Sequence, residues 1–214
     1  IPVVVSQLQP EIADVFTSKA GEMQSPLVFA DSEYKVREMS YSASGTQTFL
    51  VDHGGNPEQW DTDLMGSYQR LNLPGVLAAL DVLRNEGYRI TSDAQKQGLR
   101  MVQQLTGLMG RWQKLQDRPL IYCDTGHNVD GITMVMEQIH RAWGPMDIVV
   151  SGAAGNFLAP VAGLSANGFK TVVDIDLLGT FNVFRGCYDL IRKPGASLIA
   201  ITAGQAVNPT MLQI

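Results

Sequence analysis

Short apolar runs alternate with segments of helical periodicity along most of this chain, and that alternation constrains its fold most strongly. The strand-like runs lie at residues 2–6, 27–30, 119–124, 147–150 and 197–202. The segments with helical spacing lie at residues 10–23, 72–87, 91–105, 129–143 and 168–192. Strands that alternate with helices are typical of βαβ units. We therefore expect an α/β fold, with an open, mostly parallel doubly wound (Rossmann-like) sheet in the C-terminal half.

Composition excludes several classes of partner. The 214 residues are 45% hydrophobic and 17% charged, which is ordinary for a soluble globular protein. A net charge of -5 gives no electrostatic footprint for nucleic acid, and no apolar run approaches the roughly 18 to 20 residues of a membrane span. Cys123 and Cys187 lack CxxC spacing, so we expect free thiols and a reducing, cytoplasmic location. His53 and His140 stand apart from each other and from any cysteine cluster, so we expect no metal site.

Two further features concern the organisation of the chain. It opens inside a strand-like run without an initiator Met and stops at Ile214, so we expect a chain cut at both ends. Gly107 and Gly110 mark a linker, which predicts one piece over residues 1–108 and another over 109–214. Residues 40–66 are rich in Ser, Thr, Gly and Asp, and they predict antiparallel or irregular structure with a strand at 48–51.

The first group of candidate functional residues follows the run at 119–124. Asp124 ends this run, and Thr125, Gly126, His127 and Asn128 lead into a helix. The carboxyl ends of parallel strands form the edge where ligands bind, and a helix N-terminus favours anions. Taken alone, this motif is explained equally well if Asp124 and Asn128 simply cap the helix.

Other segments weigh against simple capping. The chain resembles the folylpolyglutamate synthase and dihydrofolate synthase branch of the Mur ligase family in the motif at 124–128 and in four other segments. These segments are residues 1–5, 66–72 (GSYQRLN), 77–80 and 110–112 (GRW). The resemblance covers about residues 1–135 and includes an incomplete central domain over 1–108.

This ligase resemblance implies an enzyme that uses ATP and magnesium to activate a folate carboxylate as an acyl phosphate, which the glutamate amine attacks. It implies that Gln69 and Asn72 lie near the nucleotide and that Arg111, Asp124 and His127, with Asn128 of the same motif, reach it from the C-terminal side. These residue types suit a nucleotide, because the guanidinium group of arginine can donate two parallel hydrogen bonds to a phosphate and a carboxylate can accept hydrogen bonds from ribose hydroxyls. However, no Gly-Lys-Ser or Gly-Lys-Thr loop occurs to bind the phosphates and the magnesium ion. The central lysine that the family has upstream of the strand resembling residues 2–5 is also absent.

The second group follows the run at 147–150. Ser151, Gly152, Ala153 and Gly155 form a turn of small residues, which permits close approach of a flat ligand or simply a tight turn.

The chain resembles a short-chain dehydrogenase/reductase of the dienoyl-CoA reductase-like branch over about residues 137–214. Three successive segments carry this resemblance, at residues 144–156, 173–183 and 197–203. The resemblance implies that Ser151, Gly152, Ala153 and Gly155 line an NAD(P) site. It also implies that Asp176 stands at the position of the tetrad Asn and Thr202 near that of the catalytic Ser. The TGxxxGxG loop and the Tyr-x-x-x-Lys pair of the family are absent.

The two resemblances meet at residues 131–139, within one predicted helix. We therefore expect a fragment or chimera that binds a small-molecule nucleotide and is catalytically incompetent as either enzyme. An NAD(P)-dependent short-chain oxidoreductase and a non-catalytic chimeric α/β scaffold remain alternatives. The oligomeric state, and whether the fusion is natural, engineered or an assembly artefact, stay open.

Overall fold

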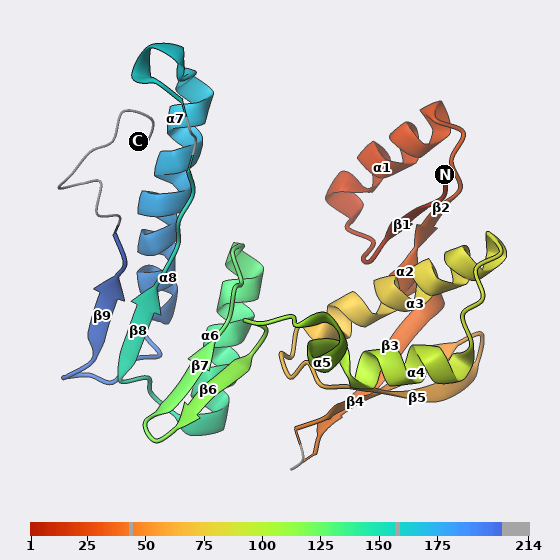
Figure 1. Cartoon of the computed structure of the whole chain (residues 1–214), viewed down its shortest axis with the longest axis horizontal. Coiled ribbons are helices and arrows are strands. Elements are labelled where there is room, and N and C mark those ends of the chain that lie inside the picture. The colour runs from red at the N-terminus through yellow and green to blue at the C-terminus, as the bar shows by residue number, and fades with distance from the viewer. Residues whose placement is uncertain (43–44, 157–158, 203–214) are drawn as a thin grey trace. The chain divides into compact units, whose positions relative to one another are not determined.

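A computed structural model describes residues 1–42, 45–156 and 159–202, apart from the side chain of Val161. The chain divides into two compact units, Ile1–Asp124 and Thr125–Ile214. The α/β class is confirmed, since helices and strands both occur in each unit (Figure 1). The boundary expected at residues 108–109 rests on the sequence motifs and stays a prediction.

The first unit opens with a βαβ arrangement. β1 (Val3–Val5) and β2 (Leu27–Phe29) are parallel, with Val4 opposite Val28, and α1 (Pro10–Glu22) connects them. Pro10 is tolerated because the first turn of a helix lacks an intrahelical acceptor for its N–H. The predictions of these three elements are confirmed to within one or two residues.

An antiparallel sheet occupies the middle of the first unit. β3 (Tyr34–Tyr41), β4 (Gln47–His53) and β5 (Asn56–Thr62) pair in that order, after the short α2 (Ala30–Glu33). α3 (Gln69–Asn85) packs against β3 and α4 (Ser92–Arg100) against β5 (Figure 1). The buried core between them consists of Ala30, Tyr34, Phe49, Val51, Trp60, Leu73, Leu77 and Ala78.

Local signals explain most helix ends here. Gly87 follows α3 with a φ of 95°, and the Thr91 hydroxyl caps α4 by accepting from the Ala94 N–H. The helix predicted over 91–105 is interrupted at Met101, and α5 (Val102–Thr106) begins anew. Distant Asp63 explains the break, because its carboxylate accepts from the backbone N–H groups of Val102 and Gln103.

The last strands of the first unit correct one prediction. β6 (Gln113–Asp117) and β7 (Leu120–Cys123) form an antiparallel hairpin, with Asp117 opposite Leu120. Leu120 is 43% exposed, so the expected buried parallel strand is wrong. Only two residues separate the strands, and such a connection permits antiparallel pairing alone.

The second unit begins with α6 (Val129–Trp143) and β8 (Ile148–Ser151). A 3₁₀ turn, η1 (Val161–Gly163), leads into a continuous helical segment of α7 (Ala166–Val173), the π-helical η2 (Asp174–Leu178) and α8 (Gly179–Cys187). β9 (Ser197–Ala200) then pairs parallel to β8, and α8 packs along β8 (Figure 1).

The described residues do not show the expected doubly wound sheet. They form four separate small sheets, and the parallel sheet of the second unit has two strands. Among the described residues, no helix is long and apolar enough to cross a membrane.

Candidate functional site

Asp124 connects three parts of the first unit. Its Oδ2 accepts from the Tyr68 hydroxyl at 2.8 Å and from the Trp112 backbone N–H at 2.7 Å. Tyr68 directly precedes α3, Trp112 precedes β6 and Asp124 follows β7. Hydrogen bonds to a charged group are the stronger ones, at about 1.5 to 3 kcal/mol. The carboxylate is thereby held in one position at the end of the hairpin.

The segment before β6 places Arg111 close enough to Tyr68 for its positive charge to act on that phenol. Gly110 and Trp112 both have left-handed backbone conformations, with φ of 70° and 51°. The Gly110 N–H donates to Gln113 Oε1 at 2.8 Å, and the buried Trp112 ring lies 5.1 Å from the Tyr122 ring. These contacts fix a tight turn around Arg111.

The ionisation of Tyr68 reports the charges around it. Burial, the hydrogen bond to Asp124 and the negative charge of that carboxylate raise the pKa of Tyr68, and the positive charge of Arg111 opposes them. Sequence analysis had given Tyr68 and Trp112 no role. No local pattern could reveal them, because their link to Asp124 depends on tertiary contacts.

Gln69 and Asn72 lie in the first turn of α3. Asn72 Nδ2 donates to Gln69 Oε1 at 3.1 Å, and Gln69 is buried whereas Asn72 is exposed. The structure therefore brings four of the expected nucleotide-binding residues into the first unit, with Gln69 following directly after Tyr68. Their role at a nucleotide stays a prediction.

His127 and Asn128 belong to the second unit. Asn128 Oδ1 accepts from the Gly131 N–H at 2.7 Å and caps α6, as the simpler interpretation of the motif expects. His127 is exposed, and its Nδ1 lies 3.3 Å from the Thr125 carbonyl oxygen. Helix capping therefore accounts for Asn128, while nucleotide contact by either residue stays a prediction.

The small-residue turn after β8 is anchored at both ends. Ser151 is buried, and its hydroxyl donates to Thr180 Oγ1 at 3.3 Å. The Gly155 N–H donates to Asp176 Oδ1 at 2.5 Å. Asp176 lies in η2, and π-helical turns are frequent at functional sites. Sequence analysis missed Thr180, which carries no motif of its own.

Packing explains part of the small-residue pattern. A Cβ on Gly155 would lie 2.8 Å from Ile175 Cδ1, and a Cβ on Gly179 would lie 3.3 Å from Ala153 Cβ. A Cβ on Gly152 meets no atom within 4 Å. Gly155 therefore makes room for the protein's own helical segment, whereas Gly152 leaves space at the surface.

Thr202 lies beside the same turn. The N–H of the preceding residue, Ile201, donates to the Ser151 carbonyl at 3.0 Å, and Thr202 itself is exposed. Asp176 therefore contacts the Gly155 end of the turn, and the backbone N–H of Ile201, the neighbour of Thr202, contacts the Ser151 end. Their catalytic roles stay predictions.

The donor sets do not fit the complete cofactors. Among residues 1–42, 45–156 and 159–202, no group of three His, Cys, Asp or Glu side chains could hold a metal ion. Ile175 fills the space beside Gly155, which leaves Gly152 as the open position of the turn.

Comparisons with known proteins give two separate likenesses. The sequence model of the family described as "Enoyl-(Acyl carrier protein) reductase" matches residues 81–211. The peroxisomal 2,4-dienoyl-CoA reductase of Rattus norvegicus is 44% identical over 84 residues, which are 39% of this chain and 29% of the relative.

The second likeness is to folylpolyglutamate synthase. The enzyme of Lacticaseibacillus casei is 25% identical over 182 residues, which are 84% of this chain and 42% of the relative. A solved structure titled as an FPGS-AMPPCP-folate complex has a TM-score of 0.62 at 19% identity, covering 94% of this chain and 50% of that chain. At this identity the structural likeness shows the fold alone. The chain thus spans half or less of the length of each relative.

Proposed function

The chain belongs to the family described as enoyl-(acyl carrier protein) reductase over residues 81–211, it resembles folylpolyglutamate synthase over most of its length, and from these two premises we propose a nucleotide-binding function without turnover. Adenine nucleotide binds weakly at Arg111 and Asp124, with Gln69 and Asn72 nearby, and neither parent reaction is catalysed. A segment joined from two enzyme classes, as a chimera or fragment, accounts for both likenesses.

The position of Asp124 is the observation that carries this proposal. Two hydrogen bonds from Tyr68 and Trp112 orient its Oδ2, so the carboxylate is preorganised as an acceptor for ribose hydroxyls. Arg111, in the adjoining turn, supplies the planar donor group that suits phosphate. The AMPPCP named for the similar structure supports an adenine nucleotide as ligand.

Calorimetric titration with Mg-ATP tests the proposal. We expect a weak saturable heat at millimolar nucleotide, with affinity reduced about tenfold in Arg111→Ala because a charge-assisted contact to phosphate is lost. Arg118→Ala is the matched control, since Arg118 is exposed in the loop between β6 and β7 of the same unit. No heat from the unmodified chain, or equal affinity in Arg111→Ala, would refute nucleotide binding here.

A second candidate function is NAD(P)H binding at the turn of residues 151–155. The open space at Gly152 favours it. The loss of the pyrophosphate loop places it below the first candidate. In this view the chain is a remnant of an NAD(P)-dependent oxidoreductase with Asp176 and Thr202 at its former catalytic positions.

NADPH fluorescence tests the second candidate. Gly155→Trp is unsuitable because it would displace Ile175, whereas Gly152→Trp fills open space. We expect NADPH emission to increase on adding protein and this increase to disappear in Gly152→Trp. Gly186→Trp on α8, also in open space, is the matched control. An unchanged emission spectrum would exclude this candidate.

A further inference from the structure

The chain contains one Asn-Gly dipeptide, Asn167-Gly168, and one Asp-Gly dipeptide, Asp130-Gly131. Each occupies the second and third residues of a helix, α7 for the first and α6 for the second. Asparagine followed by glycine is chemically labile, because glycine has no side chain to shield its backbone nitrogen from the neighbouring carboxamide. Asn167 is therefore a candidate for spontaneous modification.

The reaction available to this dipeptide is an internal condensation. The Gly168 nitrogen attacks Cγ of Asn167, a bond forms between these two atoms, and the bond from Cγ to Nδ2 breaks. Ammonia leaves and carries away the hydrogen of the Gly168 N–H. The cyclic imide then takes up one water molecule and opens either to aspartate or to isoaspartate, in which the main chain runs through Cγ. Water is the only co-reactant.

The fold withholds the attacking nitrogen. The N–H groups in the first turn of a helix lack an intrahelical acceptor. The Gly168 N–H instead donates to Ser165 Oγ at 3.0 Å, and Gly168 is buried. The Phe169 N–H donates to the Ser165 carbonyl at 3.0 Å, which closes the helical turn around Asn167. Ser165 therefore accepts both hydrogen bonds that keep this nitrogen from Asn167 Cγ.

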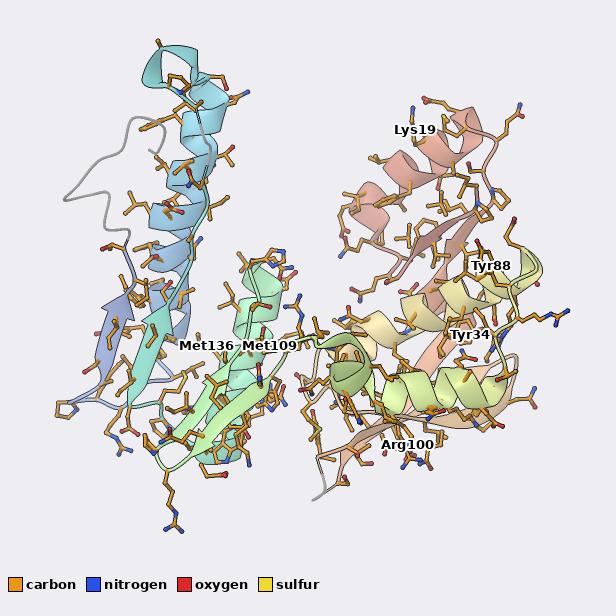
Figure 2. The ribbon with its side chains drawn as sticks, in the orientation of Figure 1. Lys19, Tyr34, Tyr88, Arg100, Met109 and Met136 are labelled. Atoms are coloured by element: carbon orange, nitrogen blue, oxygen red, sulfur yellow. The ribbon has the colours of Figure 1, made fainter. Side chains whose placement is uncertain are left out.

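The carboxamide lies on the solvent side. Asn167 is exposed, and so are its neighbours Ala166 and Lys170. Side chains project from several sides of α7 in Figure 2. Water can therefore reach Asn167, and the step that controls the reaction is the local opening of the first turn of α7.

The start of α6 repeats this arrangement. The Gly131 N–H, which follows Asp130, donates to Asn128 Oδ1 at 2.7 Å. Both dipeptides of this kind in the chain thus have the glycine N–H bound to the side chain of the helix N-cap. A carboxylate is a poorer electrophile than a carboxamide, so Asn167 is the more reactive of the two residues.

We propose that Asn167 is a site of spontaneous deamidation and that the Ser165 cap sets its rate. Asn167 remains an amide while the cap is closed, and it converts to aspartate and isoaspartate when the first turn of α7 opens. Isoaspartate places an additional methylene group in the main chain, so this turn cannot re-form with its original spacing. Ser165, Asn167 and Gly168 belong to neither of the proposed nucleotide sites.

Peptide mapping by mass spectrometry tests the proposal on the full chain, incubated at mildly alkaline pH. We expect Asn167 to convert about fivefold faster in Ser165→Ala than in the unmodified chain, which corresponds to about 1 kcal/mol. Ser165→Thr keeps a hydroxyl cap, so it is the matched control and should convert at the unmodified rate. Asn182, within α8 and followed by Val183, is the internal control and should remain an amide.

A second variant and a second condition keep the test decisive. Ser165→Gly removes the same oxygen at a smaller cost to the helix, and it decides the result if Ser165→Ala loses its circular dichroism spectrum. In urea every variant should convert Asn167 at one common rate, faster than the folded unmodified chain. Equal rates in the folded unmodified chain and the folded variants without the hydroxyl would overturn the role of the cap. An unconverted Asn167 in urea would overturn the site itself.

Discussion

At the scale of single residues, Asp124 organises the candidate site of the first unit. Its two donors, Tyr68 and Trp112, come from segments 56 and 12 positions away in the sequence. These two donors hold the carboxylate in place, and burial together with the bond to Asp124 keeps the Tyr68 phenol protonated to higher pH. The same contacts give a measurable signature, since they raise the pKa of Tyr68.

We predict that Tyr68 makes stability fall at alkaline pH. The unfolded chain ionises tyrosine near about pH 10, whereas burial and Asp124 hold the folded phenol in its neutral form to higher pH. Its contribution is therefore complete below about pH 10 and is lost as the pH rises toward the folded pKa. Between about pH 8 and 10.5, the urea midpoint should fall further in the unmodified chain than in Tyr68→Phe.

Tyr34 does not confound this comparison. Its pKa is also raised, chiefly by burial and by the bond to Asp81, but it is present in both proteins. Equal falls in the urea midpoint would contradict the assignment of the shift to Tyr68.

At the scale of elements, prediction succeeded where the signals are local. The limits of α6 are predicted because Asn128 caps its start and Gly144 follows its last residue. Prediction failed where distant groups intervene, as at Met101, where Asp63 starts a new helix. The expected single helix over 168–192 contains the π-helical η2, beside which the Gly155 N–H bonds to Asp176. Sequence periodicity does not reveal such a contact.

At the scale of the whole molecule, the chain divides into two units and has two likenesses, each of which covers half or less of a relative. No phosphate-cradling Gly-Lys-Ser loop and no Tyr-x-x-x-Lys pair occur within the 214 residues. A single lost donor in a comparable charge-stabilising site costs about 3 to 4 kcal/mol, and general acid catalysis contributes roughly a hundred- to ten-thousand-fold.

We therefore predict no turnover by this chain in either parent reaction. The measurements are ADP release dependent on folate and glutamate, and NADPH oxidation with a dienoyl-CoA. Saturable activity that Asp124→Ala abolishes in the first assay, or Asp176→Ala in the second, would show that other residues replace the absent groups.

The sequence by itself determined the α/β class, most helices and their caps, the antiparallel middle region and both family resemblances. These depend on periodicity, capping residues and short motifs, all of which act over a few neighbouring residues. Only the tertiary structure decided that β7 pairs with β6, that Tyr68 bonds to Asp124, and that Ile175 fills the space beside Gly155. The last two contacts join residues 56 and 20 positions apart, so packing rather than local preference selects them. The apolar run of β7 by itself does not distinguish a buried parallel strand from a strand of a hairpin.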